Sequence, residues 1–400
     1  MSFEVPGNWC WVKVADISSV IVYGVSESAK SEGKFKLLRI TDIQDNAVNW
    51  NTVPYTDYPE SKSENYILQA GDILFARTGA TVGKSYLVDD DVPENAIYAS
   101  YLIKVRVSNM IIPQYVKYFF ESGFYWEQIA NNSVGVGQPN VNGSSLGNLW
   151  VPIPPIQEQR RIVDKLVSWC LMIDKISENQ ELITQQIEEL RNHILNLAIS
   201  GKLVAQEPSD EPAIELLKKV NPAYKPCDNR HYKQLPDSWE ICQLKDIFDI
   251  TMGQSPAGDT INGKSGIEFH QGKLNFTEKY LSESGQYTTA PSKVAVPESL
   301  LLCVRAPVGI VNITKREICI GRGLCSLRPK YDIDCLFWLY MLSTLKDYFD
   351  ENATGSTFKA ISGEIIRNAT IPFPPVPEQK RILLKINELF YFLDKITAVL

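Results

Sequence analysis

Several features that would indicate a membrane, secreted or metal-binding protein are missing from this sequence. No run of about eighteen apolar residues occurs, so we expect no transmembrane helix. The N-terminus, Met-Ser-Phe-Glu-Val-Pro, lacks the basic start and the apolar stretch of a signal peptide. The 8 cysteines include no Cys-x-x-Cys pair, and the 3 histidines lie far apart in the sequence. We therefore expect no metal site and predict a cytoplasmic protein with reduced thiols.

The chain also has no excess of basic residues. Its formal net charge is −7, and residues 1–150 hold 11 basic and 16 acidic side chains, compared with 14 and 16 in residues 236–370. This balance argues against a domain that binds nucleic acid over its whole surface. Any such binding must come from a local basic surface or be shared with partner subunits.

Three short motifs are similar to catalytic or nucleotide-binding signatures, but each lacks an essential residue. Gly79-Ala-Thr-Val-Gly-Lys-Ser85 has one residue too few between its glycines for a P-loop. Asn221-Pro-Ala-Tyr224 differs by one residue from the Asn-Pro-Pro-Tyr of adenine methyltransferases, and no glycine-rich loop for a methyl donor precedes it. Pro236-Asp-x-x-Glu240 is similar to a nuclease core, but Cys242 replaces the catalytic lysine. We therefore predict no catalytic residues and no cofactor.

The most informative feature is an internal repeat. Its period of about 220–230 residues indicates a duplicated domain, because solenoid repeats are far shorter. The matched segments are Pro6 with Pro236, Trp9 with Trp239, 73–77 with 301–305 (both ending in arginine), and the proline motif 152–159 with 372–379. Within each copy, short apolar runs bounded by Gly, Asn, Asp and Pro predict strands. One helix is expected in each copy, over 113–129 and 333–348.

After each proline motif the apolar residues follow a heptad pattern, which predicts a long helix. In the first copy the only polar position of the seam is Gln180, and the apolar positions are Ile162, Leu166, Trp169, Ile173, Ile176, Ile183, Ile187, Leu190, Ile194 and Leu197. In the second copy they are Ile382, Ile386, Leu389, Leu393 and Ile396. The first helix, ended by Gly201, would be about 65 Å long. Since neither seam should remain in water, we predict that the two helices pair. A helix packed only on its own domain is the alternative, which this length disfavours.

These patterns divide the chain into five parts. We predict globular domains at 1–150 and 236–370, spacer helices within 151–201 and 371–400, and a proline-containing linker at 202–235 with a short helix near 212–220. The sequence ends at Leu400, well before the point of the second helix that corresponds to Gly201, and it leaves open whether the chain is truncated there or naturally short. Part of the first seam would then be uncovered, so we expect self-association or stability that depends on a partner.

Together these features resemble the specificity subunits of type I restriction-modification enzymes. The resemblance rests on the two proline motifs that open long helices, and on Leu197–Val204, Asp210–Leu217 and Leu235-Pro-x-x-Trp239, in this order over essentially the whole chain. It implies an α+β protein with two mixed α/β target-recognition domains joined by long helices that form an antiparallel coiled coil. Each domain would read one half of a split DNA site, and the helices would set the spacing between the halves.

The resemblance also implies the partners. Two modification subunits would dock on the helices and methylate an adenine flipped out of each half-site. Restriction subunits, which act as motor and nuclease, would complete the complex. The methyl donor, ATP and magnesium belong to those subunits, so this chain would be a non-catalytic, DNA-binding subunit without a cofactor.

The residues that contact DNA can be chosen only by their chemistry. Arg, Lys, Asn, Gln, Ser and Thr on loops read base edges, and other basic groups hold phosphates. The candidates in the first domain are Arg77, Thr78, Lys84, Gln138 and Asn140. Those in the second are Gln254, Arg305, Lys315, Arg316, Arg322, Thr357 and Lys359. The loops 133–143 and 353–363 occupy equivalent places before the spacer helices. For each residue, an ordinary solvated side chain is the open alternative.

Two other functions stay open at this point. A scaffold that joins proteins through the coiled coil without touching DNA would suit the acidic domains. An N6-adenine methyltransferase is the enzymatic alternative, but it would need a methyl-donor loop and an intact Asn-Pro-Pro-Tyr motif.

Overall fold

A computed structural model describes residues 3–132, 141–227, 232, 234–331, 334–355 and 359–400. The chain forms two compact units, unit 1 (Met1–Ser177) and unit 2 (Glu178–Leu400). The helix α5 (Ile156–Ile199) begins in unit 1 and ends in unit 2. None of the helices in the described residues is both long and apolar enough to cross a bilayer.

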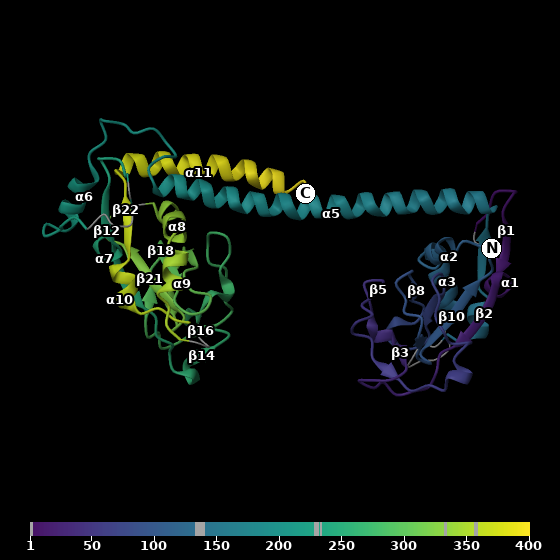
Figure 1. The fold of residues 1–400 in the computed structure, drawn as a ribbon. Helices are drawn as coiled ribbons and strands as arrows, with labels where there is room; N and C mark the ends of the chain where they lie inside the picture. The colour runs from purple at the N-terminus through teal and green to yellow at the C-terminus, as the bar shows by residue number, and fades with distance from the viewer. Residues whose placement is uncertain (1–2, 133–140, 228–231, 233, 332–333, 356–358) are drawn as a thin grey trace. The chain divides into compact units, whose positions relative to one another are not determined.

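Unit 1 is built around a four-stranded antiparallel sheet with the order β2-β10-β7-β8 (Figure 1). A smaller sheet, β6-β3-β9, includes a parallel pair, and a ribbon of β1 and β11 leads into α5. The elements before α5 are β1 (Cys10–Lys13), α1 (Val14–Ile17), β2 (Ser18–Tyr23), β3 (Phe35–Leu38), β4 (Ile43–Gln44), β5 (Ala47–Val48), β6 (Tyr55–Thr56), β7 (Ile73–Ala76), β8 (Ser85–Leu87), β9 (Ala96–Tyr98), β10 (Leu102–Val107), α2 (Pro113–Phe119), α3 (Gly123–Asn132), α4 (Gly143–Gly147) and β11 (Trp150–Ile153).

Unit 2 repeats this arrangement. Its four-stranded sheet has the equivalent order β13-β21-β18-β19, and β12 and β22 form the equivalent ribbon before α11. The elements after α5 are α6 (Ala213–Val220), β12 (Glu240–Gln243), α7 (Leu244–Ile247), β13 (Phe248–Met252), β14 (Ile261–Asn262), β15 (Ile267–His270), β16 (Tyr287–Thr288), β17 (Val294–Ala295), β18 (Ser299–Cys303), β19 (Val311–Thr314), β20 (Ile318–Ile320), β21 (Leu324–Pro329), α8 (Cys335–Ser343), α9 (Lys346–Glu351), α10 (Gly363–Asn368), β22 (Thr370–Phe373) and α11 (Val376–Thr397). The predicted fold class, two mixed α/β domains joined by long helices, is confirmed.

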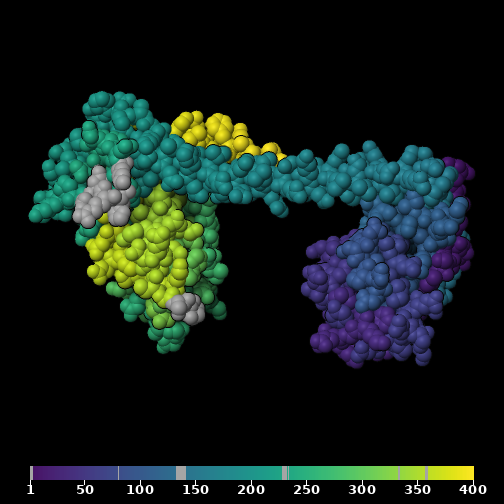
Figure 2. All heavy atoms as spheres, viewed as in Figure 1, coloured from purple at the N-terminus to yellow at the C-terminus, as the bar shows by residue number. Residues whose placement is uncertain are grey.

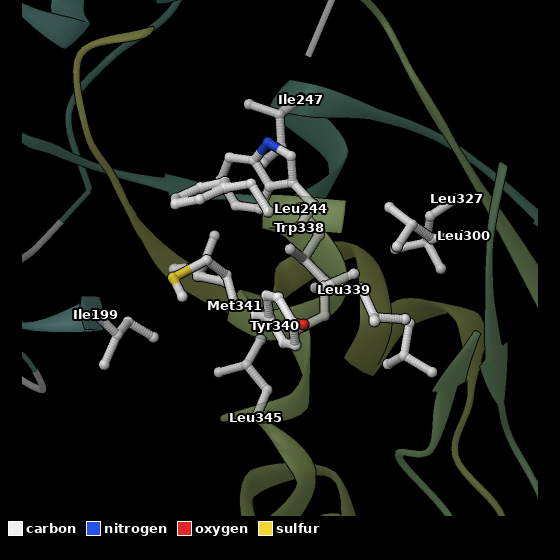
Figure 3. Packing of buried hydrophobic residues seen from close by; sticks show 14 of the residues in the cluster. Ile199, Leu244, Ile247, Leu300, Leu327, Trp338, Leu339, Tyr340, Met341 and Leu345 are labelled. Atoms are coloured by element: carbon white, nitrogen blue, oxygen red, sulfur yellow. The ribbon is translucent and has the colours of Figure 1, made fainter. Parts of the chain in front are cut away.

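Each four-stranded sheet packs against the helices that follow it. In unit 2, α8 is apolar on nearly all sides and lies in the core, where the Trp338 ring is beside Ile247 (Figure 3) and where Leu300 and Leu327 of the sheet belong to the same buried cluster. A helix that is apolar all round is buried, so α8 fixes the sheet to the rest of the unit.

The single helix predicted in each copy is wrong, since both are divided in two. In unit 1 the chain breaks between α2 and α3, where the Ser122 hydroxyl accepts a hydrogen bond from the Tyr125 N–H at 3.2 Å. In unit 2 it breaks between α8 and α9, where the Thr344 hydroxyl donates to the Met341 carbonyl at 2.7 Å. These hydroxyls offer the backbone local hydrogen bonds that compete with helix continuation.

The predicted helix pairing is confirmed within unit 2. The helix α11 runs antiparallel to the C-terminal part of α5, because Gln180 bonds the carbonyl of Leu400 and Arg191 pairs with Asp394 (Figure 1). Figure 2 shows α11, in yellow, against that part of α5.

The seam positions differ in burial. Among them Ile187, Ile382, Ile386 and Leu393 are buried, Ile162, Leu166, Ile183, Ile194, Leu197 and Leu389 are half-buried, and Trp169, Ile173, Ile176, Leu190 and Ile396 are exposed. Ile162 packs against the core of unit 1. Leu383 and Phe390, which are outside the predicted seam, are buried as well.

Candidate nucleic-acid interface

Several loops meet at one end of the four-stranded sheet in unit 1. The strand β2 ends at Tyr23, β7 ends just before Arg77, and Tyr101 comes just before β10. Because neighbouring strands are antiparallel, these three residues lie at the same end. The Val141 N–H donates to the Arg77 carbonyl at 3.0 Å, which brings the segment before α4 to this end too.

Arg77 is half-buried here, and its side chain makes few polar contacts. The guanidinium carbon lies 4.8 Å from the centre of the Tyr23 ring, and Nη1 lies 3.5 Å from the Ser100 carbonyl oxygen. Nε is buried and has no hydrogen-bond partner among the described residues. The Tyr23 hydroxyl accepts a hydrogen bond of 2.6 Å from the Gly143 N–H.

The other candidates of the first domain follow Arg77 or fall outside the described residues. Thr78 is half-buried and precedes a short 3-10 turn at Gly79–Thr81. Lys84 is exposed and lines a cavity of about 510 Å³, together with the β4–β5 hairpin and the ion pair Lys117–Glu121. The segment after Lys84 is the strand β8, whereas a phosphate-binding loop is followed by a helix. Gln138 and Asn140 lie outside the described residues.

In unit 2, four candidates come together at the equivalent end of the sheet. Gln254 follows β13, Arg305 follows β18 and Arg322 precedes β21, and all three are exposed. Lys359 joins them, since its carbonyl accepts a hydrogen bond of 3.0 Å from the Ala306 N–H. The Lys359 ammonium lies 2.7 Å from a carboxylate oxygen of Asp350 at the surface. Thr357 lies outside the described residues.

Lys315 and Arg316 lie at the other end of the same sheet. Both follow β19, which is antiparallel to β18, so they are separated from Arg305 by the length of the strands. The Lys315 ammonium lies 3.7 Å from the centre of the Tyr280 ring. The structure thus divides the candidates of the second domain into two groups.

Arg316 is engaged inside its own domain. Its Nε and Nη2 donate to the buried carboxylate of Glu268, with Nη2–Oε1 at 2.9 Å, and its other contacts are the carbonyls of Leu281 and Ser282. Burial acts to raise the pKa of Glu268, but hydrogen bonds from Arg316 and the Ser284 N–H outweigh it and lower that pKa to about 2. His270 Nε2 lies 2.9 Å from the same carboxylate, and burial lowers the His270 pKa. These contacts give Arg316 a structural role in unit 2, and whether it also contacts DNA stays a prediction.

The structure corrects the match between the two arginines of the repeat. The backbone N–H of Arg77 donates to the Tyr101 carbonyl, and the Arg77 carbonyl accepts from the Val141 N–H. In unit 2 the same two bonds are made by Val304, whose N–H donates to the Gly323 carbonyl and whose carbonyl accepts from the Ile361 N–H. Arg77 is therefore equivalent to Val304, and Arg305 to Thr78. The turn that follows is one residue longer after β7 than after β18, because the N–H groups of Gly83 and Gly309 donate to the equivalent carbonyls of Ala76 and Cys303.

Sequence reasoning missed Tyr23. Its counterpart in unit 2 is Met252, because each of the two residues precedes a glycine in an equivalent position. The Gly24 N–H donates to the Leu102 carbonyl, and the Gly253 N–H donates to the Leu324 carbonyl. The glycine that follows in both copies was the signal in the sequence that could have marked this position. A Cβ on Gly24 would lie 2.2 Å from the Tyr98 carbonyl oxygen, and a Cβ on Gly253 would lie 2.2 Å from the Gly321 carbonyl oxygen, so neither position has room for a side chain. In the described part of the chain, no group of three or more His, Cys, Asp or Glu residues is placed to hold a metal ion.

The duplicated architecture agrees with a known protein family. The family model for the type I restriction modification DNA specificity domain matches the chain twice, over residues 6–191 and 236–398. The chain belongs to this family.

Relatives and solved structures of the same kind cover almost the whole chain. A Methanocaldococcus jannaschii protein named as the type I restriction enzyme MjaX specificity subunit is 31% identical in an alignment of 396 positions, which covers 96% of this chain and 87% of the relative. The EcoBI specificity subunit of Escherichia coli is 25% identical, over 96% of this chain and 79% of the relative. A chain solved in a study of complex assembly and conformational transition of the type I R-M system has a TM-score of 0.69 and 25% identity, covering 99% of this chain and 94% of its own. The HsdS subunit from Thermoanaerobacter tengcongensis shares the fold, with a TM-score of 0.64, 24% identity, and coverage of 100% and 93%.

Proposed function

We propose that this chain selects the DNA sequence on which a type I restriction-modification complex acts. The observation that carries the proposal is the duplication: two units of one family place polar and basic loop residues at the same end of equivalent sheets. Each unit would read one half of a bipartite site in double-stranded DNA, unit 1 through Arg77, Thr78 and Lys84, and unit 2 through Gln254, Arg305, Arg322 and Lys359. Residues 1–150 and 236–370 would be the two target-recognition domains.

The helices would serve a second role. We infer that α5 and α11 set the distance between the half-sites and dock two modification subunits, with restriction subunits joining the complex. The exposed apolar side chains Trp169, Ile173 and Ile176 on α5 support this, because contiguous exposed apolar residues mark interaction surfaces. Self-association through the same residues is the competing outcome.

The charge of the chain favours shared DNA contacts. Both domains are slightly acidic, so DNA binding by this chain would be confined to the local surface that holds the base-reading residues. Partner subunits would then supply much of the phosphate binding. The adenine methylation and the cleavage would be the work of those subunits, with this chain supplying the sequence choice.

The test is to co-express the chain with its modification subunit and to map N6-methyladenine across the genome by long-read sequencing, with cells that lack the chain as control. We expect a split motif of two short half-sites with a fixed gap, present only with the chain. If the complex assembles but no chain-dependent motif appears, the DNA-reading function is wrong and the scaffold function takes its place. Methylation by the purified chain alone would instead indicate a methyltransferase.

A further inference from the structure

The starting point is a charged residue where the sister domain has an apolar one. Arg77 occupies the place of Val304, which is buried with 2% of its surface exposed, and the ring beneath it, Tyr23, occupies the place of Met252. A half-buried guanidinium costs free energy unless its charge is paired, so the difference calls for a role that Val304 does not have.

The described part of the fold provides no anion for Arg77. The other half-buried arginines of the described chain each have a carboxylate partner; Arg106, for example, pairs with Asp72, and Arg39 with Asp42. Among the described residues the Arg77 side chain has no ion pair, its buried Nε has no partner, and its only hydrogen bond is the long one of 3.5 Å to Ser100. Of its five N–H donors, those on the two terminal nitrogens are therefore the ones that a ligand could use.

Tyr23 holds the guanidinium in a defined orientation. The ring is attached to the end of β2 on one side, and its hydroxyl accepts from the Gly143 N–H at 2.6 Å on the other. A Cβ on Gly143 would lie 3.5 Å from this ring, so the loop packs directly on it. A guanidinium that rests on a fixed aromatic face keeps its donor edge pointing outward, and little side-chain entropy is lost when it binds.

A planar donor fork of this kind matches one base edge in particular. Arginine donates two parallel hydrogen bonds to O6 and N7 of guanine in the major groove, and lysine, which presents a compact point charge instead of a planar fork, fits this edge less well. We propose that Arg77, positioned by Tyr23, reads a guanine in the half-site of unit 1 and so determines one base of the target sequence. This inference rests on the proposed DNA-reading function.

The test compares base preferences one position at a time. The assembled complex with wild-type chain, Arg77→Lys, Arg77→Ala, Tyr23→Leu or Tyr23→Phe would be offered duplexes in which each base pair of the methylated motif is replaced in turn. For the wild type, replacing one G·C pair of one half-site should weaken binding about tenfold or more. Arg77→Ala should lose this discrimination, and Arg77→Lys should weaken it, at that pair only, with the other half-site and the gap unchanged. Tyr23→Leu should reduce the discrimination at the same base pair, whereas Tyr23→Phe, which keeps the ring, should retain most of that discrimination.

Arg39→Ala is the matched control, because it removes an arginine that is already paired with Asp42, and it should leave every base preference as in the wild type.

The outcomes separate the inference from the function it rests on. If wild-type complex gives no motif, the DNA-reading function itself fails. If the motif is present and Arg77→Ala keeps full discrimination at every pair, Arg77 contacts a phosphate or nothing, and the inference is overturned. If Arg77→Ala does not fold, which loss of binding at all duplexes and of the thermal transition would show, Arg77→Gln, which has no cationic fork, is measured in its place.

Discussion

The guanidinium of Arg191 in α5 forms an ion pair with Asp394 in α11 and lies 4.8 Å from the centre of the Phe390 ring. The pair joins the helix of the first repeat to the helix of the second. Surface ion pairs contribute little on their own, so the apolar side chains beside this one supply most of the stability of the pairing.

A buried residue of α11 provides the first prediction. Ile386 is fully buried, whereas Leu384 on the same helix is 70% exposed. Ile386→Ala should destabilise unit 2 by about 2–5 kcal/mol, because it leaves a cavity, and Leu384→Ala by less than about 0.5 kcal/mol. Since two units need not unfold together, amide hydrogen exchange of α11 is the suitable measurement. Equal exchange in the two variants would contradict the packing described here.

The exposed part of the α5 seam leads to a second prediction, which concerns partners. Ile173 and Ile176 are each more than half exposed, so the double change to Glu should leave the unfolding temperature nearly unchanged. It should weaken binding of the modification subunit at least tenfold, because carboxylates would enter an apolar contact. Lys175→Glu, on the same turn but outside the seam, shifts the net charge by the same amount and should have little effect. Calorimetric titration of each variant with the modification subunit measures the two affinities. Equal weakening by the double change and by Lys175→Glu would indicate an effect of charge and not the loss of an apolar contact.

The sequence predicts periodic features better than local ones. The helices, their pairing and the duplication follow from repeats of apolar residues and prolines, which survive substitution at single positions. No pattern in the sequence reveals that Glu268, 48 residues before Arg316, lies against it in the folded unit. Arg77 and Arg305 look equivalent in sequence because each follows an apolar run, and only the hydrogen bonds around the strands show that they differ by one residue in register. Side-chain partners across strands therefore required the structure.

The end of α5 gives a third prediction. Gly201 has φ +69°, and a Cβ there would lie 2.6 Å from two ring carbons of Pro236. Gly201→Ala should destabilise unit 2 by more than about 1 kcal/mol, because both the left-handed backbone and the contact oppose a side chain. Gly258→Ala is the control, since nothing lies within 4 Å of its Cβ position. Denaturant midpoints compare the two, and a midpoint unchanged by Gly201→Ala would show that the backbone at this position adjusts freely.

The Glu268–Arg316 pair predicts how unit 2 responds to acid. Although burial acts to raise the Glu268 pKa, Arg316 and Ser284 lower it to about 2 in the folded chain, from an ordinary value of 4.5. A carboxylate whose pKa is lower in the folded state stabilises the fold above its unfolded pKa, and this stabilisation is lost as the pH falls from about 4.5 to about 2. Burial lowers the pKa of the neighbouring His270 as well, but that histidine would take up its proton in the unfolded chain near its ordinary 6.5, above this range.

Glu268→Gln isolates the contribution of this carboxylate. The variant keeps the shape of the side chain but loses the charge, so it should unfold at lower temperature than wild type at pH 6, and the difference should shrink as the pH falls from about 4.5 to about 2. Glu278→Gln, in which the replaced side chain is 71% exposed, should follow the wild-type curve throughout. Unfolding temperatures measured every half pH unit would resolve the three curves. A constant difference between wild type and Glu268→Gln down to the lowest pH would mean that the hydrogen bonds of Glu268 stabilise unit 2 and that its charge contributes nothing.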